Sequence, residues 1–405
     1  MAVERIVIIG AGQAGAQAAV SLRQGGYKGA ITMIGAEEAP PYQRPPLSKA
    51  YLKGDLDEAR LYLRPAEFYE SQEIALHLGV HATGIDRKAK AVSTDDGETH
   101  LYDALLIATG APPRRISAPG ADLTGVHYLR TLADSDSLRP MLAAPGRVVI
   151  VGAGYIGLEV AAVARQAGRE VTVLEMAPRV LARVASEPVS AFYESLHKNA
   201  GVDLRLGAAF AGFEGEGRIH GARLQDGEVI ECETALVGIG AAPEVSLAVT
   251  AGLDVENGII VDEHARSSDP SIFAAGDCTN FPSPRYGRRM RLESVPNAIE
   301  QAKAAAANML GNETVYDALP WFWSDQYDVK LQTVGLMEGH DDLIVRGDPA
   351  EKKFAVWYLK DGKALAVDAI NDPASFAMGK KLIMTGATLD PAKLADTNVD
   401  LKALA

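Results

Sequence analysis

Glycines at two places in this sequence have the spacing of loops that bind dinucleotides. The pattern G-x-G-x-x-G occurs at Gly10, Gly12 and Gly15, and again at Gly152, Gly154 and Gly157, with Ile156 inside the second copy. In such a loop the first glycine allows a tight turn, and the second lets the backbone approach a pyrophosphate. The third lets the helix pack closely on the strand. Two copies therefore predict two dinucleotides bound at once, most simply a flavin and a nicotinamide.

The cysteines limit the redox chemistry that could connect these two cofactors. The chain has two, Cys232 and Cys278, which fit neither a C-x-x-C nor a metal-ligand pattern. We therefore expect no metal site, no disulfide framework and a reducing, cytoplasmic location. Without a cysteine pair between flavin and substrate, electrons must leave the flavin directly for an outside acceptor.

An acid at the end of the second strand of each copy would bind ribose hydroxyls. Glu175 follows an apolar run in the second copy, where a carboxylate would repel the extra phosphate of NADP, so NADH is favoured. In the first copy Ala36 stands where the acid is expected. Glu37, the next residue, is our candidate for the adenosine ribose.

The elements that position these loops follow from the apolar pattern. A continuous apolar strand precedes each glycine turn (3–9 and 148–151), a helix follows (14–24 and up to 167), and a second strand comes next (30–34 and 170–174). Continuous apolar strands are typical of buried parallel sheets. A further strand is expected over 235–240.

The organisation along the chain predicts an α/β protein with two Rossmann-like dinucleotide-binding domains and a small α+β C-terminal domain. We expect an FAD-binding domain at 1–113 and 243–319, an NAD-binding domain at 114–242, and the C-terminal domain at 320–405. In that last domain, alternating segments at 353–359 and 364–370 predict antiparallel strands with helices at the end.

The overall charge and hydropathy exclude two classes of partner. The formal net charge is −13, which argues against nucleic acid as a general partner. No apolar run approaches the length of a membrane span. We expect neither a nucleic-acid nor a membrane partner.

Several longer motifs give the sequence a specific resemblance. They are Pro41-Tyr42-Gln43-Arg44-Pro45-Pro46-Leu47-Ser48-Lys49, Ala108-Thr109-Gly110, Ile272-Phe273-Ala274-Ala275-Gly276-Asp277, Glu293-Ser294-Val295-Pro296-Asn297-Ala298 and Pro320-Trp321-Phe322-Trp323-Ser324-Asp325-Gln326. Together they resemble the FAD-dependent ferredoxin reductases of bacterial oxygenase systems, which are similar in fold to glutathione reductase. The match runs in order along nearly the whole chain.

The resemblance implies a reaction and roles for matched positions. It implies hydride transfer from NADH to FAD, followed by single-electron transfer to a 2Fe-2S ferredoxin that supplies an oxygenase. Lys49 and Glu159 would form a pair beside the flavin, where burial would make its strength depend on flavin charge. The other matched positions would bind the cofactors: Asp277, Glu293, Val295 and Trp323 the FAD, with Arg44 and Thr109 as further cofactor-binding residues. Gly240, at the end of the apolar run from residue 235, is also a candidate for cofactor binding.

Two alternatives remain open at this stage. A rubredoxin reductase differs in its acceptor, which is an iron-only carrier instead of a 2Fe-2S ferredoxin. A relative of apoptosis-inducing factor resembles the chain at 44–49 but responds to NADH by changing shape and partners. The absence of cysteine at 40–51 disfavours disulfide reductases and peroxide-reducing relatives.

Four arginines in seven residues form a local basic patch on this acidic chain. Arg285, Arg288, Arg289 and Arg291 directly precede Glu293. Since iron–sulfur ferredoxins are acidic, we predict that these arginines help to dock the ferredoxin near the flavin. Arg64, Lys330, Lys380 and Lys381 could extend the patch.

Overall fold

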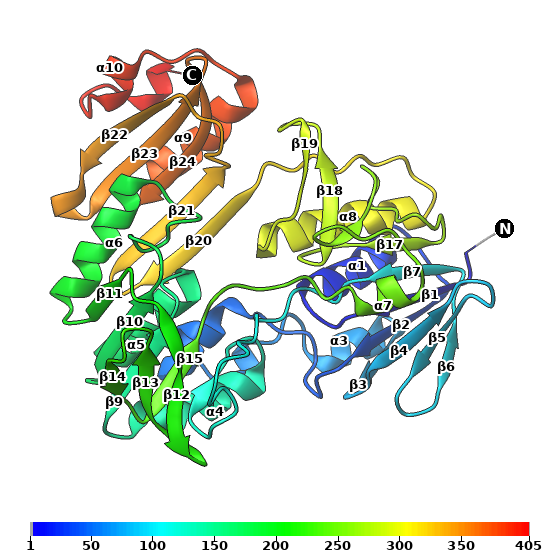
Figure 1. Cartoon of the computed structure of the whole chain (residues 1–405). Helices are drawn as coiled ribbons and strands as arrows, with labels where there is room; N and C mark the ends of the chain where they lie inside the picture. Colours follow the sequence, from blue (N-terminus) through cyan, green and yellow to red (C-terminus); the bar gives the residue numbers. More distant parts are fainter. Residues whose placement is uncertain (1–2, 405) are drawn as a thin grey trace. The chain divides into compact units, whose positions relative to one another are not determined.

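The computed structural model describes residues 3–404, which form two compact units (Figure 1). Of the described residues, the first unit comprises 3–43, 58–112 and 241–318. The second unit comprises 44–57, 113–240 and 319–404. Each unit is therefore assembled from segments that are far apart in the sequence.

A parallel five-stranded sheet forms the centre of the first unit. Its strand order is β17-β7-β1-β2-β3, with β17 at Ile272–Ala274, β7 at Ala104–Ile107, β1 at Arg5–Ile9, β2 at Ala30–Gly35 and β3 at Ile74–Leu78. Helices α1 (Gln13–Gln24) and α8 (Val295–Met309) lie side by side and share an apolar core with this sheet (Figure 1). Side chains on both faces of β1 are buried, as continuous apolar strands predict.

Smaller elements complete the first unit. Two three-stranded sheets consist of β4 (Ala82–Asp86), β5 (Ala91–Thr94) and β6 (Thr99–Leu101), and of β16 (Ile259–Ile260), β18 (Thr279–Ser283) and β19 (Arg288–Met290). The remaining helices are η2 (Glu58–Arg60), α3 (Ala66–Ser71) and α7 (Ser246–Thr250).

The second unit contains another parallel five-stranded sheet, in the order β11-β10-β9-β15-β8. The strands are β11 (Asp203–Leu206), β10 (Glu170–Glu175), β9 (Arg147–Val151), β15 (Thr234–Val237) and β8 (Val126–His127). Its helices are α4 (Leu132–Ala143), α5 (Tyr155–Gln166) and α6 (Glu187–Asn199), with η1 (Pro45–Ser48) and α2 (Ala50–Lys53) from the earlier segment. A three-stranded sheet of β12 (Phe210–Glu216), β13 (Arg218–Leu224) and β14 (Val229–Glu231) adjoins it.

The chain after residue 319 forms an antiparallel five-stranded sheet, also within the second unit. The order is β20-β21-β24-β23-β22, with β20 at Trp321–Gln326, β21 at Val329–Gly335, β24 at Lys363–Ile370, β23 at Lys353–Lys360 and β22 at Asp342–Asp348. Helices α9 (Pro373–Thr385) and α10 (Pro391–Ala395) follow, with short turns η3 (Pro349–Glu351) and η4 (Leu401–Leu404).

Strand β23 differs from the alternating pattern expected of it, because six consecutive residues are buried. Phe354 contacts Phe192 of α6 with ring centroids 5.1 Å apart, so one face is covered by that helix. On the other face Trp357 belongs to a core shared with Leu382 of α9 and Leu394 of α10. Because both faces of β23 are covered, the strand has no solvent-facing side on which polar residues would alternate.

The predicted fold class is confirmed, and the two strand–loop–helix–strand repeats form as expected. Some boundaries differ. Strand β15 ends at Val237 instead of continuing to residue 240, and β1 begins at Arg5 instead of residue 3. The division into three domains stays a prediction. None of the helices within 3–404 is long and apolar enough to cross a membrane.

Candidate functional site

The first glycine loop lies between β1 and α1, and its shape requires glycine at two of the three positions. Gly10 has φ +113°, and a side chain there would overlap the Ala108 carbonyl oxygen. A Cβ on Gly15 would overlap the Gly10 carbonyl oxygen. Gly12 is different: no protein atom lies within 4 Å of the place its Cβ would take. That open position, at a helix N-terminus without a side-chain cap, suits a pyrophosphate.

The second loop repeats this arrangement between β9 and α5. Gly152 has φ +106°, and its Cβ would overlap the Gly238 carbonyl oxygen. A Cβ on Gly157 would overlap Gly152, while the position beside Gly154 is again open. The approach of Gly238 to Gly152 coincides with the end of β15. Both loops therefore fit a dinucleotide phosphate.

The acid at the end of β10 is held at the second loop. Glu175 Oε2 accepts a hydrogen bond of 2.8 Å from the Ala153 amide, and Oε1 accepts one of 2.8 Å from the Ala177 amide. These two bonds fix the carboxylate within the turn, where a ribose is expected. In the first unit the Glu37 carboxylate accepts a hydrogen bond from the Tyr42 hydroxyl.

Two of the other matched segments of the first unit lie against the first loop. A Cβ on Gly276 would lie 3.2 Å from the Cβ of Ala14, which is at the start of α1. Half-buried Asp277 is the residue that follows Gly276 in the chain. The Ala108 carbonyl closes over Gly10, and the next residue, Thr109, donates from Oγ1 to the Glu244 carbonyl at 2.7 Å.

Glu293 and Val295 border the N-terminus of α8. Val295 is the first residue of that helix, whose N-cap Ser294 accepts from the Asn297 amide. Glu293 is exposed and forms an ion pair of 2.6 Å with Arg291. Its carboxylate therefore already has a cationic partner.

The matched positions of the second unit have varied surroundings. Arg44 donates to the Arg130 carbonyl at 2.8 Å. Trp323 stacks on Trp321 with ring centroids 5.6 Å apart. Ile156 is 48% exposed in the first turn of α5, and Gly240 has φ +104°.

Lys49 and Glu159 form a buried ion pair within the second unit. Lys49 Nζ lies 2.6 Å from Glu159 Oε2, and their side chains are 18% and 3% exposed. Lys49 follows η1, while Glu159 lies in the second turn of α5. Ser48 donates from Oγ to the same carboxylate oxygen. The predicted pairing of Lys49 with Glu159 is confirmed by this direct contact. Their role at a flavin stays a prediction.

A chain of hydrogen bonds that the sequence did not suggest ends on the other oxygen of Glu159. Ser324 donates from Oγ to Glu159 Oε1 at 2.6 Å and accepts from Gln326 Nε2 at 3.2 Å. Gln326 Oε1 in turn accepts from His197 Nε2 at 2.8 Å. Burial lowers the pKa of His197 to about 4, so a neutral ring donates here. Every donor points toward the carboxylate, which holds it in one orientation.

The same chain ties three elements of the second unit together. Ser324 and Gln326 share one face of β20 because they are two residues apart on a strand. His197 lies on α6, and Tyr327 contributes a longer contact of 3.4 Å to its Nδ1. The polar second half of β20, which follows three aromatic residues, was the available sequence signal.

Neither cysteine is placed to serve as a redox relay. Both are buried. Burial raises the pKa of Cys232 to about 12 and also raises that of Cys278. Reactive thiols need the opposite environment, partly exposed and electropositive.

Comparison with known proteins identifies the family. Residues 4–302 match the pyridine nucleotide-disulphide oxidoreductases, and residues 321–405 match a reductase C-terminal family. The chain belongs to the pyridine nucleotide-disulphide oxidoreductases. Proteins of this family use FAD and NAD(P)H, which confirms the predicted pair of cofactors.

Individual relatives of this oxidoreductase are ferredoxin reductases. It is 47% identical over 404 residues to a probable ferredoxin reductase of Castellaniella defragrans, covering 99% of each chain. It is 44% identical over 407 residues to the putidaredoxin reductase of Pseudomonas putida, covering 99% and 96%. A crystal structure of a covalent putidaredoxin reductase–putidaredoxin complex matches with a TM-score of 0.96 and 44% identity, covering 100% and 98%. The resemblance seen in the sequence is confirmed.

The arginine cluster of this oxidoreductase is largely engaged within its own unit. Arg289 donates to the carbonyls of Val261 and Asn280, at 2.6 and 2.5 Å. Arg291, paired with Glu293, is only 12% exposed. Arg288 and Arg289 are both exposed on β19.

The other cations named with the cluster divide between the units and have contacts of their own. Arg64, in the first unit, lies over the Phe68 ring. Lys380, in the second unit, lies 4.5 Å from the centroids of both Trp321 and Phe376. Lys330 approaches Asp325 at 3.9 Å. Of the original four arginines, Arg285 is 3.7 Å from Asp317.

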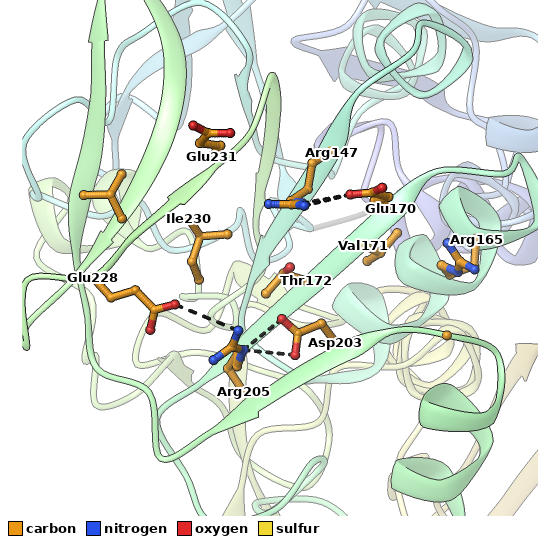
Figure 2. A pocket seen from close by; sticks show the side chains of 12 residues that line it. Arg147, Arg165, Glu170, Val171, Thr172, Asp203, Arg205, Glu228, Ile230 and Glu231 are labelled. Atoms are coloured by element: carbon orange, nitrogen blue, oxygen red, sulfur yellow. Dashed lines mark hydrogen bonds and ion pairs between the residues drawn. The ribbon is translucent and has the colours of Figure 1, made fainter.

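A polar pocket lies at the amino ends of β9, β10 and β11, the edge opposite to the glycine loop (Figure 2). Arg147 pairs with Glu170 at 2.8 Å across its upper part, and Arg205 pairs with Asp203 at 2.8 Å. Arg147 and Arg205 thus have acidic partners, and Arg165 donates to the Ala200 carbonyl. Dinucleotides, moreover, bind at the carboxyl ends of such strands. We assign this pocket no cofactor.

Proposed function

We propose that this oxidoreductase takes a hydride from NADH onto FAD and passes single electrons to a 2Fe-2S ferredoxin that supplies an oxygenase. The observation that carries the proposal is the combination of two dinucleotide loops with two buried, unreactive cysteines. Electrons that enter such a protein have no thiol relay within the chain. A small protein carrier is therefore the natural acceptor, and the ferredoxin reductases among its relatives support this choice. The reduced cysteines also favour a cytoplasmic location.

Bound FAD and NADH supply the hydride and single-electron chemistry, and the chain's own residues bind and orient these two cofactors. The open positions at Gly12 and Gly154 would admit the two pyrophosphates, and the first-turn amides of α1 and α5 would donate to them. We propose that Asp277 and Glu37 hold the FAD ribityl and ribose groups. Glu175, fixed by two backbone amides, would hold the NADH ribose and disfavour NADPH.

Lys49 is proposed to present its ammonium to the flavin, with Glu159 as its fixed counter-charge. The carboxylate is 3% exposed and accepts from Ser48, Lys49 and Ser324. Since screening by water is weak at this depth, a change in flavin charge would be felt strongly by the pair. Neither residue needs to carry a proton for hydride transfer.

Docking of an acidic ferredoxin is proposed to use Arg285, Arg288, Arg289 and Arg291, and exposed Arg288 on β19 is the position chosen for the test. Arg289 and Arg291 also stabilise their own loop, so reversing their charge would disturb structure as well as binding. Arg288→Glu should raise the KM for ferredoxin several-fold at low salt and leave NADH oxidation by a small dye unchanged. Lys303→Glu, at an exposed position of the largely buried helix α8, is the matched control for a change in net charge. Unchanged ferredoxin kinetics in Arg288→Glu would refute this docking role.

A rubredoxin reductase is the second candidate, because the chain is also 41% identical over 369 residues to the rubredoxin–NAD(+) reductase of Pseudomonas putida. A protein that resembles apoptosis-inducing factor, in which NADH changes partners instead of feeding a carrier, is the third.

The deciding experiment follows NADH-driven cytochrome c reduction by the FAD-loaded protein, with a 2Fe-2S ferredoxin, with rubredoxin and with neither. We expect a large rate that depends on ferredoxin, and a far smaller one with NADPH. A rate that depends only on rubredoxin would select the second candidate. Flavin bleaching by NADH without onward transfer to either carrier would favour the third.

A further inference from the structure

Two histidines and a glutamate converge in the first unit, away from the glycine loop of that unit in sequence. His77 lies on β3, the edge strand of the parallel sheet. His100 lies on β6, in the neighbouring antiparallel sheet, and Glu98 is two residues before it. Residues two apart on an extended chain point to the same side. One sheet therefore provides one nitrogen ligand, the other sheet provides a second nitrogen, and the residue just before β6 provides an oxygen.

The distances between the three side chains are too long for hydrogen bonds and suit ligands of one metal ion. His77 Nδ1 lies 3.8 Å from Glu98 Oε2, and His100 Nε2 lies 3.7 Å from the same oxygen. All three ligand atoms lie within 4.8 Å of one another. Ligand atoms of a tetrahedral zinc ion are about 3.4 Å apart, which follows from zinc–ligand distances of about 2.1 Å. Small rotations of the three side chains would bring their ligand atoms to these separations.

The surroundings of His100 give a second, independent indication. Its side chain is 11% exposed, and Nε2 is buried with no hydrogen-bond partner among residues 3–404. A buried polar atom without a partner is costly, and a bound ion would satisfy it. The two imidazole rings pack edge to face with centroids 4.7 Å apart. Glu98 is 58% exposed, so an ion can enter from solvent.

We propose that His77, Glu98 and His100 bind a divalent transition metal of the zinc class, with the fourth position open to water. Two imidazoles and one carboxylate are a usual ligand set for zinc, whereas magnesium and calcium prefer oxygen ligands only. The ion would join the edge of the parallel sheet to the β5–β6 hairpin. Two residues after His77, the Gly79 amide donates to the Glu37 carbonyl, so the joined segment also supports the end of β2. The proposal does not depend on the proposed function.

The test is calorimetric titration of the full, untagged, FAD-loaded chain with zinc chloride, repeated with cobalt for its tetrahedral absorption bands. We expect one equivalent to bind, and His100→Gln or Glu98→Gln to weaken binding at least about tenfold. His81→Gln is the matched control, because His81 pairs with Asp95 at 3.1 Å near the same hairpin but lies outside the cluster.

Several results would overturn the proposal. They are the absence of saturable binding to the wild-type protein, an unchanged affinity in Glu98→Gln, or an equal loss of affinity in His81→Gln. The exposed position of Glu98 makes its variant the safer one for folding, so a misfolded His100→Gln would not leave the question open.

Discussion

The hydrogen-bond chain that ends on Glu159 leads to a quantitative prediction for Ser324→Ala. The variant removes the donor to Glu159 Oε1 and, at the same time, the acceptor of Gln326 Nε2. A hydrogen bond to a charged group contributes about 1.5–3 kcal/mol, and a buried amide left without a partner costs about 1–3 kcal/mol more. Allowing for partial relaxation, we expect a loss of about 3 kcal/mol.

The assay is thermal unfolding of the FAD-loaded protein by circular dichroism. For a unit of this size, 3 kcal/mol corresponds to a fall in melting temperature of roughly 6–12 °C. Ser324→Thr keeps the hydroxyl and should recover most of the loss. Ser375→Ala is the matched control: its hydroxyl also donates to a carboxylate, that of Asp372, but Asp372 is half-buried and water can replace the bond. If Ser324→Ala melts no lower than Ser375→Ala, the hydrogen bonds that run from His197 to Glu159 do not hold the carboxylate in one orientation.

Three further predictions concern cofactor choice, loop shape and pH. Glu175→Ala should lower the ratio of kcat/KM for NADH to that for NADPH by about tenfold, as loss of about 1.4 kcal/mol implies; an unchanged ratio would remove Glu175 as the selector. Gly154→Ala should fold normally, because its Cβ meets no protein atom, but it should bind NADH weakly, because the Cβ takes the open position proposed for the pyrophosphate. Gly157→Ala should lower the melting temperature, because its Cβ overlaps backbone. Equal stability of the two variants would contradict this prediction. Burial raises the pKa of the Asp368 carboxyl to about 7, so the folded chain keeps a proton that the unfolded chain releases near its usual pKa of 3.8, and stability falls as pH rises between these values. Relative to wild type, Asp368→Asn should therefore gain about 3 kcal/mol between pH 5 and pH 8 in urea unfolding, and a constant difference would refute the assignment.

The sequence predicted the parts of the fold that depend on local pattern. An apolar run, a glycine turn and a helix are adjacent in the chain, so the loops at Gly10 and Gly152 could be placed within one or two residues. The conformation of the loop is set by neighbours such as Ala108 and Gly238, and the glycine spacing already implies such close approach.

Features that depend on distant segments could not be predicted in the same way. Glu159 meets Ser324 across 165 positions of sequence, and nothing local to either residue indicates the other. Strand β23 was expected to alternate, because its covering by α6 on one face and α9 on the other is decided by packing alone. The cluster of His77, Glu98 and His100 was missed for the same reason, since two separate sheets bring it together.

The order in which segments enter the two units has a consequence for synthesis on the ribosome. Strand β17, which pairs with the outer side of β7, lies at Ile272–Ala274, long after β7 has been made. Until it arrives, β7 presents an unpaired apolar edge of the kind that recruits other chains. The second unit is likewise incomplete until the segment that starts at Leu319 emerges. Truncation anywhere before that point should therefore give an insoluble product, and efficient expression should depend on chaperones that shield exposed sheet edges during elongation.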